Sequence, residues 1–380
     1  MTLATAPAYH GPGGQVGVFE QLGRRQMLVV TGKGGVGKTT LAAALGLTSA
    51  ASGRDTLVMT FDPSLRLKDA LGVEAVAAEQ ETEVPCAGAG RLYASLLDAR
   101  TTFDRLIDRY APDREARERI LRNRFYDNLS GNLAGVLEYM ASERLFEVAR
   151  DGTHERIVLD TPPTRQALDF LGAPERIVSF LDSGALRLAL KPWFDDGGQL
   201  RATSHLGALG RNLEGFFDRV VGLELLRDMA EFFQAFSPLY DGFRERAAEV
   251  HRLLRAPDTL FVLVSAPGRR RVADTLFFAR RLTEAGYRLG PVVVNRVHPA
   301  FPGSGGRPAT PEGDAGDGRQ LLRWLGERDQ ESVAELRSLL GGTHPLVEVP
   351  LLPDEPTNLE SLATLGTILG ERLDAAEASH

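Results

Sequence analysis

The sequence predicts an α/β fold, in which a doubly wound and mostly parallel sheet carries an inserted α-helical subdomain. Two observations lead to this prediction. Short apolar runs alternate along the chain with segments of helical periodicity, which is the order of elements in a parallel sheet wound with helices. The runs are apolar at nearly every position, as expected of strands that are buried on both faces.

The elements follow one another from residue 26 onward. The first run ends in a glycine-rich turn, and the Ala/Leu-rich helical pattern Thr39–Ser52 comes next and is closed by Gly53. Further helical patterns lie between the strand candidates, such as Arg270–Ala285, and the last helix is predicted at Leu359–Ala376. The strand candidates are Gln26–Val30, Asp55–Thr60, Arg156–Asp160, Thr259–Ser265, Gly290–Val297 and Pro345–Val349.

Two long stretches interrupt the alternation, because they are helical in pattern and contain no strand candidate. We predict that residues 101–151 and 175–256 form the helical insertions. The α/β core then comprises residues 26–100, 152–174 and 257–380, after an N-terminal extension over 1–25 that lacks the pattern of a signal peptide. Residues 299–319, rich in Gly, Pro, Ala and Asp, are predicted to form a flexible loop.

Composition limits the classes of function. A chain of 380 residues with 43% hydrophobic content can bury a full core, and no apolar run approaches the ~20 residues that span a bilayer. The net charge of -7 gives no broad footprint for nucleic acid, so we expect none as a partner. The only cysteine, Cys86, excludes an intrachain disulfide, which suits the reducing cytoplasm.

The glycine-rich turn matches the phosphate-loop pattern GxxxxGKT between a strand and a helix. Successive backbone N–H groups of such a loop point at phosphate oxygens, and the helix that follows adds its positive end. Lys38 is expected to neutralise the β- and γ-phosphates of ATP, and the Thr39 hydroxyl to coordinate Mg²⁺. The nucleotide-binding residues predicted here are Gly32, Lys33, Gly34, Gly35, Val36, Gly37, Lys38, Thr39 and Thr40.

An aspartate lies at or just past the end of each of the next two strands. Ligands bind at the carboxyl ends of strands in open α/β sheets, so both acids are candidates for the site. Asp160 fits the metal-binding role, and Asp62 fits the catalytic role of orienting or deprotonating the attacking water. Either acid has an alternative interpretation as a helix N-cap.

The loop GKGGVGKT resembles the deviant Walker A motif of the family that includes MinD, ParA, the nitrogenase iron protein and ArsA. The segments Asp62-Pro63-Ser64 and Asp160-Thr161-Pro162-Pro163-Thr164 resemble the two switches of its ArsA branch, the arsenite-pump and guided-entry ATPases. The resemblance implies that Lys33 reaches across a dimer interface to the partner's nucleotide, as an arginine finger does. Without the resemblance, Lys33 would be interpreted as a solvated loop lysine.

The resemblance extends toward the C-terminus. It implies that Asn295 hydrogen-bonds adenine and that the loop ending in Pro353 packs on the base. An asparagine at a strand end can also be a simple turn residue. There is one phosphate loop, so two chains must meet for Lys33 to act, as a homodimer or as a heterodimer with a paralogous chain.

The sequence also departs from these relatives. The arsenite pump binds its metalloid through cysteines, and the eukaryote-type guided-entry ATPase binds zinc through a CxxC pair across its dimer. Since residues 299–319 contain no Cys or His, neither arsenite nor zinc is expected as a ligand, and Cys86 is interpreted as a semi-buried small residue.

The second insertion carries Phe232, Phe233 and Phe236 at the spacing of one helix face. They can pack on the subdomain's own core, or they can line a groove for a hydrophobic protein client, since the guided-entry ATPases bind clients in this position. The final helix ends in acidic residues and does not resemble a cationic membrane anchor.

The sequence therefore predicts a cytoplasmic, dimeric ATPase of the ArsA type, in which hydrolysis opens and closes the helical subdomain. The alternative is a ParA/MinD-like positioning or partitioning ATPase that acts on a surface. The helical insertions favour the first interpretation, because the alternative does not need them.

Overall fold

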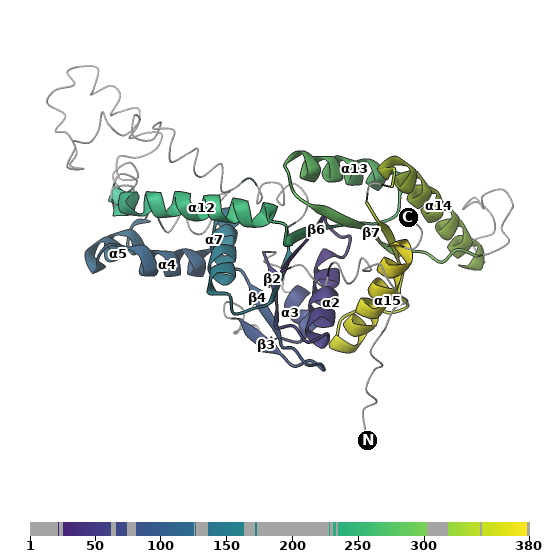
Figure 1. The fold of residues 1–380 in the computed structure, drawn as a ribbon, viewed down its shortest axis with the longest axis horizontal. Helices are drawn as coiled ribbons and strands as arrows, with labels where there is room; N and C mark the ends of the chain where they lie inside the picture. The colour runs from purple at the N-terminus through teal and green to yellow at the C-terminus, as the bar shows by residue number, and fades with distance from the viewer. Residues whose placement is uncertain are drawn as a thin grey trace, which may run out of the picture.

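An eight-stranded sheet forms the centre of the structure (Figure 1). The structure is a computed structural model and describes residues 22, 26–61, 66–73, 81–124, 126, 136–162, 172, 228, 231–232, 235–301, 318–342 and 344–377. The strand order is β3-β4-β2-β5-β1-β6-β7-β8, and every pairing is parallel except that of β3 with β4. The strands are β1 (Met27–Gly32), β2 (Thr56–Thr60), β3 (Thr82–Val84), β4 (Leu92–Leu96), β5 (Arg156–Asp160), β6 (Thr259–Ser265), β7 (Leu289–Val297) and β8 (Leu346–Pro350).

The mostly parallel α/β sheet is confirmed, and each of the six predicted strands is present to within two residues at either end. The sequence analysis missed β3 and β4. In β3 only Val84 is buried, so no apolar run marks this short edge strand. β4 holds Tyr93 and Ser95 among its apolar residues and is recognisable as a strand only through its parallel pairing with β2.

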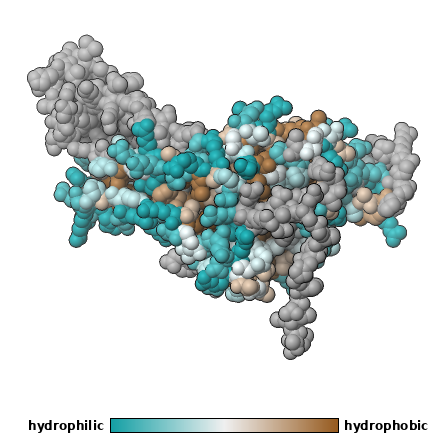
Figure 2. Space-filling model, in the orientation of Figure 1, coloured by the Kyte–Doolittle hydropathy of each residue, from teal (hydrophilic) through white to brown (hydrophobic). Residues whose placement is uncertain are grey.

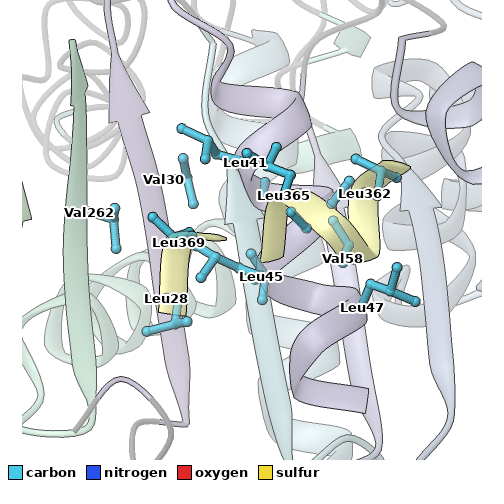
Figure 3. Packing of buried hydrophobic residues seen from close by; sticks show 14 of the residues in the cluster. Leu28, Val30, Leu41, Leu45, Leu47, Val58, Val262, Leu362, Leu365 and Leu369 are labelled. Carbon is cyan, nitrogen blue, oxygen red and sulfur yellow. The ribbon is translucent and has the colours of Figure 1, made fainter. Parts of the chain in front are cut away.

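Helices cover both faces of the sheet. One face packs on α2 and α15, and Figure 3 shows Leu28, Val30 and Val58 of the sheet against leucines of these helices. The opposite face packs on α7, α12, α13 and α14. The helices are α2 (Lys38–Ala51), α3 (Arg66–Leu71), α4 (Ala99–Tyr110), α5 (Arg114–Leu121), α7 (Val136–Asp151), α12 (Tyr240–Arg255), α13 (Arg269–Glu284), α14 (Gly318–Leu340) and α15 (Leu359–Glu377), with the short 3₁₀ helix η3 (Ser237–Leu239).

A second hydrophobic core lies beside the sheet, on the left in Figure 1, where α4, α5, the start of α7 and the start of α12 meet. We call these helices, with residues 231–232 and 235–239, the helical lobe. Its core is aromatic: the rings of Phe103 and Tyr126 lie 5.1 Å apart, and those of Phe236 and Phe243 lie 4.8 Å apart. The side chains of Asp98 and Asp113 cap α4 and α5, because each accepts a hydrogen bond from a backbone N–H group in the first turn of its helix.

The helices α7 and α12 each run from the helical lobe to the sheet. Tyr139 of α7 and Phe243 of α12 belong to the aromatic core, whereas Leu145 and Val250, farther along the same helices, belong to the core under the sheet. α7 leads into β5 and α12 leads into β6. The predicted boundaries of the insertions at 151 and 256 therefore fall at helix ends, and both helices contribute to both cores.

A buried ion pair joins α7 to α12 at the level where the two cores meet. Arg246 Nε donates to Glu143 Oε2 at 2.7 Å, and the two side chains are 8% and 3% exposed. Tyr139 also donates to Glu143, and the Arg246 guanidinium lies 4.1 Å from the centre of the Tyr110 ring. Burial raises the pKa of Glu143, and the charge of Arg246 acts against that shift.

Several predictions concern residues outside the described ranges. These are Asp62, Phe233, most of the N-terminal extension, the greater part of the predicted insertion 175–256 and most of the predicted loop over 299–319, of which α14 takes residues 318 and 319. Cys86 is half-buried, as expected, and burial raises the pKa of its thiol.

No helix among the described residues is both long and apolar enough to cross a membrane. Figure 2 shows a largely hydrophilic surface with hydrophobic residues along the upper edge, over α13.

We predict that Glu143→Gln lowers the free energy of unfolding by about 3–5 kcal/mol, because it leaves the Arg246 charge buried without its counter-ion. Urea unfolding followed by circular dichroism measures this change. Glu118→Gln is the matched control, since Glu118 pairs with Arg114 on the exposed side of α5, where such a pair contributes about 0.3–0.5 kcal/mol. Equal effects of the two changes would contradict a buried ion pair at this position.

Candidate active site

The predicted phosphate loop spans the end of β1 and the start of α2, at the carboxyl edge of the sheet. Gly32 has a φ of 149°, and a Cβ at this position would lie 2.1 Å from the Val264 carbonyl oxygen of β6. Only glycine therefore allows β1 to turn so close to its neighbour. Gly34 and Gly35 lie exposed at the loop tip, and Val36 is fully buried beneath it.

Thr39 and Asp160 meet on the β5 side of the loop. The Thr39 hydroxyl donates to Asp160 Oδ2 at 2.7 Å, and the Thr60 hydroxyl of β2 donates to the same oxygen at 2.9 Å. Asp160 is fully buried. This meeting follows from strand pairing, because Asp160 lies opposite Val30 of β1 and Thr60 of β2. Two oxygen donors this close together suit Mg²⁺, which prefers oxygen ligands.

Lys38 lies at the first position of α2 and is 7% exposed. Its Nζ donates to the Lys33 backbone carbonyl at 3.3 Å, so the ammonium group lies back over the loop. Thr40 follows it in the first turn of α2 and is half-buried. An ammonium group held over a glycine-rich loop, beside a helix N-terminus, supplies positive charge where an anion would bind.

Lys33 is turned to the other side of the loop. Its Nζ lies 2.5 Å from Asp274 Oδ2 of α13, and the two side chains are 51% and 44% exposed. This ion pair joins residues 241 positions apart in the chain and could not be inferred from sequence. In the described conformation, Lys33 therefore contacts its own chain.

Asn295 joins β7 to the phosphate loop. Its Nδ2 donates to the Val36 carbonyl at 2.9 Å, and its Oδ1 accepts from the Arg296 backbone N–H at 3.0 Å. A Cβ on Gly37, where φ is 90°, would lie 2.4 Å from this Nδ2. Arg296 is the only non-glycine residue with positive φ, at 63°, among the described residues. Such a conformation is uncommon and often marks a functional position.

The loop after β8 lies beside this end of β7. The Leu351 N–H donates to the Val297 carbonyl at 2.8 Å, and Arg296 lies 3.5 Å from Glu355. Pro353 is exposed in this loop. Asn295 and the Pro353 loop are thus brought to the same edge of the sheet as the phosphate loop.

Sequence analysis missed Thr60, Arg296 and Asp274. Of these, only Thr60 had a signal, as the last residue of a predicted strand before Asp62.

Two of the residues predicted to bind a client lie in the core of the helical lobe. Phe232 is 2% and Phe236 is 5% exposed, and their rings stack 5.2 Å apart within the aromatic core of the helical lobe. Of the two alternatives, burial favours core packing over a groove for these two residues. In this conformation they are not a client-binding surface, and the core interpretation replaces that assignment.

Comparison with known proteins identifies the family of the chain. The sequence model of the family described as anion-transporting ATPase matches residues 25–371. The chain is 25% identical to ATPase GET3 of Rhodotorula glutinis over 88% of its own length and 85% of the relative's. It is 25% identical to ATPase GET3A of Arabidopsis thaliana, covering 88% and 80%. It is 24% identical to a putative arsenical pump-driving ATPase of Aquifex aeolicus, covering 90% and 78%.

The family match includes the phosphate loop, all eight strands and most of the last helix. In P-loop ATPases, a glycine-rich loop, a lysine and a strand-end aspartate are the elements that bind the phosphates and the metal ion. The chain therefore belongs to the ArsA-type, anion-transporting ATPase family and is an ATPase.

Proposed function

We propose that the chain is a nucleotide-switched dimer in which hydrolysis of Mg-ATP opens and closes the helical lobe around a hydrophobic protein client. The observation that carries the proposal is the contact of Thr39 with Asp160 at the carboxyl edge of the sheet, with the Lys38 ammonium group over the adjoining loop. Mg²⁺ there would link phosphate oxygens to the protein and offset their negative charge.

Each residue has a separate task in this proposal. Lys38 binds the β- and γ-phosphates, and the N–H groups of Gly34 to Thr40 surround them. Thr39 and Asp160 hold Mg²⁺, with Thr60 fixing the Asp160 carboxylate through its own hydrogen bond. Asp62 orients the water that attacks the γ-phosphate. Asn295 and Pro353 bind the adenine, and Lys33 adds positive charge to the transferred phosphoryl group of the partner chain.

Coupling to the helical lobe is supported by the course of two helices. α7 leads into β5, which ends at Asp160, and α12 leads into β6, which packs against Gly32. These are the two strands that flank β1. A displacement at either strand end can therefore reach the lobe through one continuous helix. A nucleotide shifts this equilibrium only if it binds the two arrangements with different affinities.

A client would have to bind elsewhere than on Phe232 and Phe236, which are in the core. The alternative proposal, a ParA/MinD-like ATPase that acts on a surface, is less well supported, because the family match runs through the helical lobe. The relatives named above are ATPase GET3 and a putative arsenical pump-driving ATPase, and their names agree with the ArsA-type interpretation. Arsenite remains disfavoured, since the chain contains one cysteine.

We predict that Lys38→Ala lowers the rate of ATP hydrolysis by at least about 10²-fold, because the transferring phosphates lose a preorganised positive charge. Phosphate release at saturating Mg-ATP measures the rate, and thermal unfolding checks that the fold is intact. Arg269→Ala is the control, since this cation lies exposed at the start of α13. Turnover near the wild-type rate in Lys38→Ala would show that the loop does not bind the phosphates as assigned.

We predict that Lys33 and Asp62 act on the same phosphate from different chains. A mixture of Lys33→Ala and Asp62→Asn chains should recover about a quarter of wild-type turnover if two-fold symmetric dimers exchange at random. Each mixed dimer keeps one site with its own Asp62 and the partner's Lys33. Mixing Lys33→Ala with the Lys33→Ala/Asp62→Asn double variant should recover none. Absence of recovery in dimers proven to be mixed would place Lys33 in cis.

We predict that backbone amide exchange in α7 and α12 differs between ADP and a non-hydrolysable ATP analogue, because these helices would transmit the nucleotide state. Hydrogen-exchange mass spectrometry of the full chain measures it. Peptides from α15, on the opposite face of the sheet, are the internal reference. Identical exchange of α7 and α12 in both saturated states would remove the support for coupling to the helical lobe.

A further inference from the structure

The Lys33–Asp274 ion pair places the loop lysine on the side of β1 away from the metal-binding residues. β5 and β6 flank β1 on opposite sides, and α13 begins soon after β6. Thr39 contacts Asp160 at the end of β5, whereas Lys33 contacts Asp274 on α13, at 2.5 Å. The Lys33 ammonium group is thus bound to a carboxylate of its own chain, at the edge of a shallow surface recess that both residues line.

We propose that Asp274 is a positioning residue, which holds Lys33 on its own chain until a triphosphate on the partner chain displaces it. This inference rests on the proposed trans role of Lys33. Because the Lys33 side chain is turned toward α13 of its own chain, reaching a phosphate across an interface means leaving Asp274, so dimer closure exchanges one anion for another. Asp274 thereby opposes closure in the absence of nucleotide.

The strength of the two contacts decides the direction of the exchange. A half-exposed ion pair is weak, because water screens both charges and the long lysine side chain loses freedom. A triphosphate carries more negative charge than one carboxylate, and an interface excludes water, so the trans contact becomes stronger on closure. The ion pair between Lys33 and Asp274 therefore biases the nucleotide-free chain against dimer closure. It is too weak to keep Lys33 from the triphosphate of the partner chain.

A second cation on α13 can pair with the Asp274 carboxylate after Lys33 has left it. Arg271 lies one helical turn before Asp274 on α13 and lines the same recess. Its Nη1 is buried and has no hydrogen-bond partner within the part of the chain that the structure describes. Release of Lys33 therefore does not leave Asp274 without a nearby positive charge, and this lowers the cost of the exchange.

The first test measures the ion pair itself in the full chain without nucleotide. The ion pair holds the Lys33 amine against Asp274, so loss of that carboxylate should free the amine to react. We expect brief acetylation by an N-hydroxysuccinimide ester to label Lys33 about two- to fivefold faster in Asp274→Asn than in wild type, as read by peptide mass spectrometry. Glu284→Gln removes the same charge from the far end of α13 and should change nothing. Equal Lys33 labelling in wild type and Asp274→Asn would overturn the proposal.

The second test measures association by sedimentation with a non-hydrolysable ATP analogue and Mg²⁺. Asp274→Asn should dimerise at a concentration about two- to fivefold lower than wild type. Added salt should reduce this difference between the two dimerisation midpoints, because it screens the exposed ion pair of the wild type. In a Lys33→Ala background, Asp274→Asn should have no effect. An unchanged dimerisation midpoint, or an effect that persists without Lys33, would overturn the proposal and leave the trans role intact. Wild-type association and turnover in Lys33→Ala would instead refute the trans role itself.

Discussion

The parallel pairing of β1 between β5 and β6 is the constraint on which the rest of the active site depends. It brings Val30 beside Asp160 on one side and Gly32 beside Val264 on the other. The turn after β1 must then pass within contact distance of the β6 backbone, which requires glycine at position 32. The same pairing carries the Asp160 carboxylate to the Thr39 hydroxyl without any dedicated loop.

The strands that flank β1 also carry the helices of the helical lobe. α7 and α12 are held together at their midpoints by the Glu143–Arg246 ion pair, and each extends from the aromatic core to the core under the sheet. Replacing a buried ion pair by apolar groups is often neutral or stabilising, so such a pair is weak evidence of stability alone. Here it fixes the register of two helices that end at the strands beside the phosphate loop.

The sequence predicted the elements whose signals are local. The strands around the phosphate loop are continuously apolar, and the GxxxxGKT motif requires a strand before it and a helix after it, so β1, α2, β5 and β6 could be placed to within two residues. The edge strands β3 and β4 had no such signal. The Asp274 and Thr60 contacts depend on which strands are neighbours, and the burial of Phe232 and Phe236 depends on partners from α4 and from Tyr126. An amphipathic stripe alone cannot separate a core from a groove.

We propose that Thr39 and Asp160 form a metal site that nucleoside triphosphate completes. Electron paramagnetic resonance of Mn²⁺, used in place of Mg²⁺ and titrated into the full chain with and without a non-hydrolysable ATP analogue, tests this site directly. We expect one bound Mn²⁺ per chain only when the analogue is present, with an affinity lowered at least about tenfold by Thr39→Val. Mn²⁺ binding of equal affinity without nucleotide, or binding unaffected by Thr39→Val, would contradict it.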